Sequence, residues 1–338
     1  MAKSAPRMIN SFNVMKCTKT WQRLVAVLIS VILLSLGWLG LSGIGLLVAL
    51  IPLLIISESY SDSRRDWWRM CGWATLTFLA WSVSTIWWVW NAAPIGVFTA
   101  SIVGSFYNLC GVMVYHYTSK RAKRALAYTL LVTIWLATEW AYNSADVMTF
   151  PWLLLGHGFS EDIWAVQWYE YTGIFGGTLW ALCSNVAIFE AVRTRQPRRV
   201  LLASAIVIIP IIVSLSLYWS YEPSERSVKI SVIQPNVPCY DDEREAADMM
   251  DPTATIIELM HEVPEESKFV LLPEASLAYI PSIGTVDEGS TEFYAPLFEH
   301  LHSAKSQDIK LIAGASTVRY YGDVEATETA RKSDFGYS

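Results

Sequence analysis

Residues 200–219 read Val-Leu-Leu-Ala-Ser-Ala-Ile-Val-Ile-Ile-Pro-Ile-Ile-Val-Ser-Leu-Ser-Leu-Tyr-Trp and contain no charged side chain. A helix needs about 20 mostly apolar residues to cross the hydrocarbon layer of a bilayer. The stretch therefore predicts a transmembrane helix. It also marks a boundary, because the chain before it is a series of apolar runs and the chain after Tyr221 has the composition of an ordinary water-soluble protein.

Further apolar runs precede this stretch, and with it they predict about seven transmembrane helices. The six runs are residues 24–38, 41–57, 71–90, 95–117, 125–143 and 166–192. Only Gly37, Gly40 and Gly43 separate the first run from the second, which favours two close helices joined by a tight glycine turn over a single kinked span. No small-residue cleavage site follows a short apolar core, so we expect a retained anchor instead of a signal peptide.

Basic residues mark one side of the predicted membrane domain. Sixteen of the 25 lysines and arginines precede Tyr221. They are Lys3, Arg7, Lys16, Lys19, Arg23, Arg64, Arg65, Arg69, Lys120, Arg121, Lys123, Arg124, Arg193, Arg195, Arg198 and Arg199. The intervening loops, 91–94 and 144–162, contain none. Because basic residues concentrate in cytoplasmic loops, the N-terminus is predicted inside and the soluble part outside.

Three parts of the chain follow from this pattern. We predict a cytoplasmic segment over residues 1–23, a transmembrane helical domain over 24–220, and an exterior domain over 221–338. The exterior part is acidic, and the whole chain carries a net charge of −6, which argues against a nucleic-acid partner. The five cysteines show no spacing typical of a metal site or a disulfide framework, and most of the 16 tryptophans lie near predicted span ends, as interface anchors do.

Two polar residues stand out in the membrane half. Glu139 lies inside a predicted span, where a carboxylate is a functional candidate, but it also lies near the outer end, where it could reach water. Residues 150–157, Phe-Pro-Trp-Leu-Leu-Leu-Gly-His, are too apolar for a solvated loop and too short to cross. We expect them at the outer interface or dipping into it. His157 there is more typical of a packed or hydrogen-bonded histidine than of a residue that lines a lipid-facing cavity.

The region after Tyr221 predicts an α/β unit. Residues 228–234, 269–272 and 310–313 have the apolar, β-branched character of strands, and residues 243–263 and 293–305 have helical spacing. Three strands do not complete a sheet covered on both faces, so the domain is expected to be incomplete within these 338 residues. Glu274 follows the second strand, at the edge where α/β sheets bind ligands. Partly desolvated there, it could serve as a general base, although a solvated loop glutamate occupies such a position equally well.

Several of these pieces together resemble one family, the bacterial apolipoprotein N-acyltransferases. The matching pieces are Phe150-Pro151-Trp152 with Gly156, residues 167–173 with Gly176-Gly177, residues 232–236 (Val-Ile-Gln-Pro-Asn), residues 271–276 (Leu-Leu-Pro-Glu-Ala-Ser) and residues 311–314 (Leu-Ile-Ala-Gly). The resemblance implies a multi-span membrane domain joined to an exterior carbon–nitrogen hydrolase domain, which is a nitrilase-like αββα sandwich. It also implies location in the bacterial inner membrane and no cofactor or metal.

The resemblance further implies an acyltransferase for groups other than aminoacyl, acting through a Glu-Lys-Cys triad. The Cys thiolate attacks an ester of phosphatidylethanolamine, and the resulting thioester is attacked by the α-amine of a diacylglyceryl-cysteine lipoprotein. Glu274 matches the base. Trp152, His157, Tyr240 and Glu139 are further candidates for substrate binding, although Tyr240 could equally be a solvent-facing loop residue.

The chain departs from the family pattern after the third strand. No segment matches those that carry the family's Lys and nucleophilic Cys, and no closing transmembrane helix is present. Lys332 and Cys239 lie in the wrong contexts, and Tyr142 and Asn143 stand where the family often has an Arg. We therefore expect a truncated sequence whose 338 residues alone are catalytically inactive.

Other functions are also considered. A membrane-anchored amidase or nitrilase would share the hydrolase fold but would not need seven helices. A non-catalytic paralogue would bind lipid or lipoprotein without turnover. A transporter is disfavoured, because no charged pair lies in mid-span and no internal repeat is evident.

Overall fold

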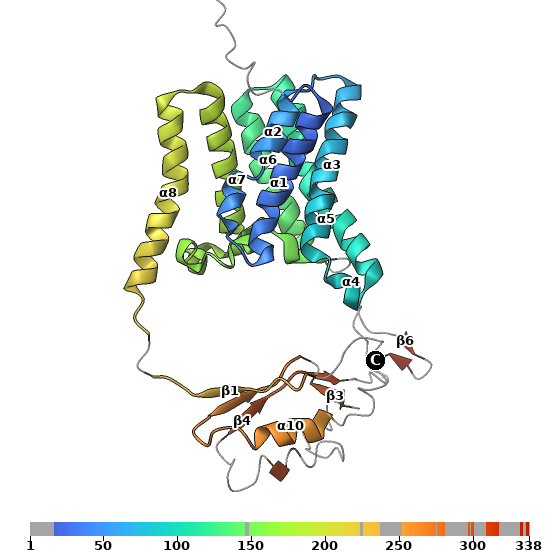
Figure 1. Cartoon of the computed structure of the whole chain (residues 1–338), viewed down its shortest axis with the longest axis vertical. Helices are drawn as coiled ribbons and strands as arrows, with labels where there is room; N and C mark the ends of the chain where they lie inside the picture. The colour runs from blue at the N-terminus through green and yellow to red at the C-terminus, as the bar shows by residue number, and fades with distance from the viewer. Residues whose placement is uncertain are drawn as a thin grey trace, which may run out of the picture. The chain divides into compact units, whose positions relative to one another are not determined.

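The structure is a computed structural model that describes residues 17–145, 149–223, 226–236, 252–274, 276–280, 297, 299–300, 309–317, 332–333 and 336–337. The chain divides into two compact units, Met1–Glu222 and Pro223–Ser338. We call them the helical unit and the strand unit (Figure 1).

The helical unit consists mainly of α-helices, with a longer connection between α6 and α7. They are α1 (Thr20–Ser35), α2 (Ile51–Glu58), α3 (Arg64–Ile86), α4 (Val89–Ala92), α5 (Pro94–Arg121), α6 (Arg124–Asn143), α7 (Tyr169–Thr194) and α8 (Pro197–Ser220). Prolines occupy the first turn of α2, α5 and α8, where the missing N–H has no intrahelical partner and the fixed φ suits a helix start. All seven predicted apolar runs contain helical residues.

Four helical segments of the described chain are long and apolar enough to cross a membrane, judged by length and composition. They are Thr20–Leu39, Pro94–Arg121, Tyr169–Thr194 and Pro197–Ser220. Helix α2 belongs to the shorter apolar stretch Gly43–Glu58. Helices α3 and α6 are 23 and 20 residues long but do not meet this combined criterion. The predicted helical unit with membrane-crossing helices is confirmed, while seven crossings and their orientation stay predictions.

The glycine-rich stretch between α1 and α2 reverses the chain. Short 3₁₀ turns, η2 (Leu36–Leu39) and η3 (Gly43–Leu47), flank Gly40, whose φ of 72° is in the left-handed region. The Cys17 N–H donates to the Ser59 hydroxyl at 2.8 Å, and the Ser30 hydroxyl donates to the Ala49 carbonyl at 2.7 Å. These pairings make α1 and α2 antiparallel, so the prediction of two helices is confirmed and a single kinked span is wrong.

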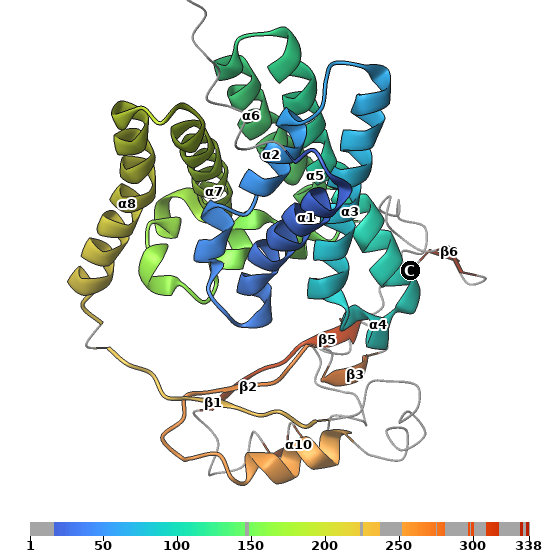
Figure 2. The same cartoon turned by 45° about the horizontal axis from the view of Figure 1, so that its top comes forward.

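Helix α8 lies at the outer edge of the helical unit. It packs against α7 and buries only Ala203 and Ser214 among its side chains. Figures 1 and 2 both place α7 between α8 and the other helices. Most of the surface of α8 is therefore available to lipid.

The strand unit contains a parallel sheet in the order β1-β2-β4. The strands are β1 (Ile230–Val232), β2 (Phe269–Leu271), β3 (Leu277–Ile280), β4 (Lys310–Ile312), β5 (Ala315–Thr317), β6 (Lys332–Ser333) and β7 (Gly336–Tyr337). Helix α10 (Pro252–Met260) covers the sheet through Ile256 and Met260, which pack with Val270 of the central strand. The three predicted strands are confirmed. A three-stranded sheet does not by itself show an αββα sandwich, which stays a prediction.

Candidate functional site

Glu139, the predicted intramembrane carboxylate, lies in α6 with 2% of its surface exposed. Its Oε1 accepts hydrogen bonds from the Trp135 indole N–H and the Leu155 backbone N–H, both at 2.9 Å. Its Oε2 accepts one from the Thr178 hydroxyl at 2.7 Å. The interpretation that Glu139 reaches water is therefore wrong, because uncharged protein donors surround both oxygens. Direct substrate contact by Glu139 stays a prediction, and the geometry favours a role in positioning its neighbours.

The neighbour that Glu139 positions is the segment of residues 151–165, which we call the buried segment. It comprises the 3₁₀ turns η4 (Pro151–Leu153), η5 (Leu155–Phe159) and η6 (Ile163–Ala165). Leu155 is 1% exposed and Phe159 is fully buried. The core of this apolar loop is thus packed inside the protein, and its placement relative to the membrane interface stays a prediction.

Gly156 brings the buried segment into direct backbone contact with α7. Its N–H donates to the Thr178 hydroxyl at 3.0 Å, and its carbonyl accepts from the Tyr169 hydroxyl at 2.8 Å. A Cβ at Gly156 would lie 1.9 Å from the Ile174 carbonyl oxygen. Only glycine fits this approach, so Thr178 can serve both Gly156 and Glu139.

Asp162, near the C-terminal end of the buried segment, forms hydrogen bonds with the turn between α1 and α2. It is 4% exposed and accepts hydrogen bonds from the Ser42 hydroxyl at 2.9 Å and the Gly43 N–H at 2.6 Å. Sequence reasoning did not single out Asp162. A carboxylate between apolar stretches was a usable signal, but its partners lie about 120 residues away in the chain.

Trp152 is one of several exposed residues in the buried segment, with 52% of its surface accessible. Its ring lies 5.7 Å from that of Trp88 and 6.2 Å from that of Phe150, measured between centroids. Its carbonyl accepts from the Trp38 indole N–H at 2.9 Å. These contacts hold Trp152 in an exposed aromatic cluster, and substrate binding by Trp152 stays a prediction.

The structure says less about substrate binding by the other two predicted residues, His157 and Tyr240. His157 is half-buried, and its Nδ1 lies 3.1 Å from the Pro151 carbonyl oxygen, so the hydrogen-bonded interpretation fits. Tyr240 lies outside the described residues. The described residues include no group of three or more His, Cys, Asp or Glu placed to hold a metal ion.

Glu274, the predicted base, lies in the strand unit. It is exposed, in a turn just beyond β2, which is the central strand of the sheet. The parallel register Ser231–Val270–Leu311 brings the carboxyl ends of all three strands to that edge. Of the two interpretations left open by the sequence, this exposure fits the solvated loop glutamate, and the role of Glu274 as a general base stays a prediction.

Comparison with known proteins finds a family that is similar to the helical unit. Residues 30–187 match the family described as apolipoprotein N-acyltransferase N-terminal domain. This range includes Glu139, Thr178 and the whole buried segment. Over this range the chain is similar to the apolipoprotein N-acyltransferases. The predicted resemblance is confirmed, and the N-acyltransferase N-terminal domain falls within the helical unit.

Two curated relatives carry the same name. The apolipoprotein N-acyltransferase of Chlorobaculum tepidum is 26% identical over 223 residues, which cover 63% of this chain and 39% of the relative. That of Rickettsia prowazekii is 23% identical over 159 residues, covering 46% of this chain and 31% of the relative. The matched part thus spans about two fifths or less of each relative's length.

Proposed function

We propose that this chain provides the membrane domain and the general base of an apolipoprotein N-acyltransferase. The enzyme would move an acyl chain from a phospholipid, such as phosphatidylethanolamine, to the N-terminal amine of a diacylglyceryl-cysteine lipoprotein. The observation that carries the proposal is the placement of Glu274. It follows the central strand of a parallel sheet, in a chain whose helical unit matches the family's N-terminal domain.

In the proposed reaction Glu274 accepts the proton of a cysteine thiol. The thiolate attacks the phospholipid ester, a thioester forms, and the lysophospholipid leaves with a proton. The lipoprotein amine then attacks the thioester, so an amide forms and the thiol is regenerated. A lysine would stabilise the oxyanion in each step.

Neither that cysteine nor that lysine has a counterpart among these 338 residues. A polypeptide of these residues alone is therefore expected to be inactive, since loss of a nucleophile costs several orders of magnitude in rate.

We further propose an orientation in the bacterial inner membrane. Arg124 and Arg199 begin α6 and α8 at one end of the bundle, and short basic loops face the cytoplasm. With seven crossings, the buried segment and the strand unit then lie on the exterior side. Both lipid substrates could reach that side by lateral diffusion.

The test uses the protein as its source cell makes it. The intact mass from native membranes is compared with the 38.0 kDa of this chain, and acyl transfer to a diacylglyceryl lipopeptide is followed by mass shift. Glu274→Gln should lower the rate at least 100-fold, the usual contribution of a general base. Glu265→Gln is the matched control, because Glu265 is also exposed but precedes β2.

Full activity of Glu274→Gln would refute the assigned base. A mass of 38.0 kDa together with lipopeptide binding that survives Glu274→Gln and no turnover would instead favour the non-catalytic paralogue.

A further inference from the structure

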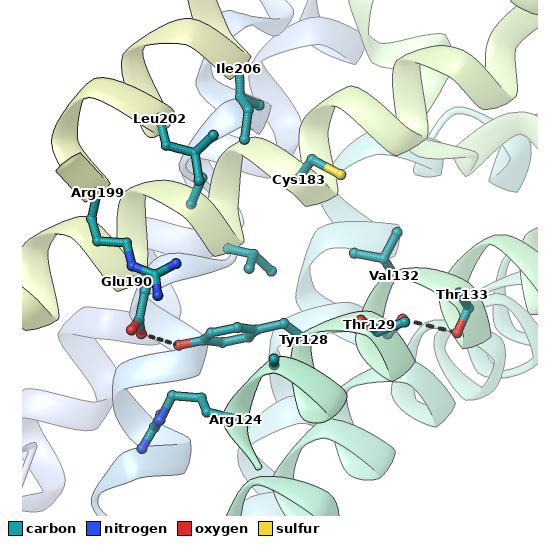
Figure 3. Close-up of a pocket in the computed structure, with 13 residues that line it drawn as sticks. Arg124, Tyr128, Thr129, Val132, Thr133, Cys183, Glu190, Arg199, Leu202 and Ile206 are labelled. Atoms are coloured by element: carbon teal, nitrogen blue, oxygen red, sulfur yellow. Dashed lines mark hydrogen bonds between the residues drawn. The ribbon is translucent and has the colours of Figure 1, made fainter.

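A pocket of about 440 Å³ lies between α6, α7 and α8, away from the groups that bind Glu139. It is lined by Arg124, Ala125, Tyr128, Thr129, Val132, Thr133, Cys183, Val186, Ala187, Glu190, Arg199, Leu202 and Ile206 (Figure 3). The volume is typical of a small-molecule site.

Charged groups gather at one end of the pocket, and the rest of its lining is mostly apolar apart from Thr129 and Thr133. Figure 3 shows Arg199, Glu190 and the Tyr128 hydroxyl together at one end, and Cys183 and Val132 at the other. From Arg199 to Ile206 the pocket follows α8 for about two turns, or roughly 10 Å. Such a shape suits a molecule with a charged head and an apolar tail.

The two carboxylates near the polar end, Glu190 and Glu58, already form ion pairs with arginines. Glu190 Oε1 lies 2.7 Å from Arg193 Nη2, and Glu190 Oε2 accepts from the Tyr128 hydroxyl at 2.8 Å. Both Nη atoms of Arg124 donate hydrogen bonds to the Glu58 carboxylate, at 2.7 and 3.2 Å. The charge left over at this end is therefore positive.

Arg199 carries that surplus charge. Its side chain is exposed and makes no hydrogen bond or ion pair with any part of the chain that the structure describes. A guanidinium pairs well with phosphate because it presents several N–H groups in one plane. Helix α8, which bears Arg199, is also the helix with the fewest buried side chains and is thus open to lipid.

We propose that this pocket binds an anionic glycerophospholipid of the cytoplasmic leaflet. Its phosphate pairs with Arg199, and one acyl chain lies along Val132, Val186 and Ile206. The leaflet follows from the proposed orientation, but the site itself does not depend on acyl transfer. The bound lipid would fill the gap between α6 and α8 and hold α8 against the bundle.

The test is native mass spectrometry of the whole chain released from nanodiscs of equal parts phosphatidylglycerol and phosphatidylethanolamine. The unmodified protein should retain one phosphatidylglycerol in preference to phosphatidylethanolamine. Arg199→Gln should lower the retained fraction about tenfold, since a charge-assisted hydrogen bond is lost. Arg198→Gln is the matched control, because Arg198 is a neighbouring exposed arginine that does not line the pocket.

Equal loss in both arginine variants would overturn the site, because it would show general attraction to a basic surface. Equal retention of the two lipids, or no retained lipid on the folded protein, would also overturn it. Ala187→Trp fills the pocket from α7 without changing charge and should abolish retention even if Arg199→Gln fails to fold. Acyl transfer is not measured, so either proposal can fail without the other.

Discussion

At the scale of single residues, hydrogen bonds offset the free-energy cost of burying the Glu139 carboxylate. A buried charge or polar group is expensive in an apolar interior unless it is hydrogen-bonded. Here three donors from α6, the buried segment and α7 converge on its two oxygens. Three separate parts of the chain thus depend on one side chain.

Replacing Glu139 by Ala should therefore destabilise the helical unit by about 2–5 kcal/mol, because it leaves buried donors without an acceptor. Glu139→Gln keeps an oxygen for the Leu155 N–H and should cost less. Thermal unfolding in detergent, followed by tryptophan fluorescence, measures both. Thr138→Ala is the control, because the Thr138 hydroxyl bonds only to the carbonyl of Trp135, within its own helix. Equal midpoints for Glu139→Ala and Thr138→Ala would contradict the assignment.

Glycine substitutions provide a second test. Gly156→Ala should unfold the buried segment or displace α7, because the new Cβ would meet the Ile174 carbonyl at 1.9 Å. Gly72→Ala in α3 meets nothing within 4 Å and should be neutral or stabilise by up to about 1 kcal/mol. Limited proteolysis of residues 151–165 and the unfolding midpoint distinguish the two. Similar behaviour of both variants would argue against the close approach at Gly156.

At the scale of elements, Asn185 of α7 forms hydrogen bonds with the backbone that precedes α2. Its Nδ2 donates to the Leu46 carbonyl at 2.6 Å, and its Oδ1 accepts from the Leu50 N–H at 2.7 Å. The backbone between η3 and α2 is not helical, so its polar groups need partners from elsewhere. Asn185, which is fully buried, supplies them.

Asn185→Leu, with nearly the same volume, should lower the free energy of unfolding by about 2–4 kcal/mol, because it leaves the buried Leu50 N–H without its acceptor and removes one donor from the Leu46 carbonyl. Asn91→Leu in exposed α4 is the matched control and should change stability by less than about 0.5 kcal/mol. Chemical denaturation in mixed micelles provides the comparison. If both variants unfolded at the same denaturant concentration, the bridging role of Asn185 would be wrong.

At the scale of the whole molecule, the proposed orientation makes a prediction about accessibility. Four exposed residues lie near helix ends that the proposed orientation assigns to opposite sides: Asn91, Glu161, Lys123 and Arg198. In intact spheroplasts a membrane-impermeant maleimide should label Asn91→Cys and Glu161→Cys. Lys123→Cys and Arg198→Cys should react only after permeabilisation. The reverse pattern would invert the topology, and a mixed pattern would contradict seven crossings.

Much of the architecture followed from local patterns. Long apolar runs predicted the helices, glycines at 37, 40 and 43 predicted a turn, and β-branched runs predicted β1, β2 and β4. Glu274 was placed at a strand end because a strand and its terminating Pro273 are visible in a few consecutive residues. Hydropathy and side-chain periodicity are properties of short windows, so the chain alone carries them.

The environments of the polar residues were decided only by tertiary packing. Glu139 meets Leu155 and Thr178, 16 and 39 residues away, and Asp162 meets Ser42, 120 residues away. Whether a carboxylate on an apolar helix faces water or three donors depends on which helix packs beside it and in what register. The sequence by itself predicted the apolar helices and the resemblance to the apolipoprotein N-acyltransferases. Only the tertiary structure decided that the segment 151–165 lies buried, because hydrogen bonds between distant segments form only once those segments are packed together.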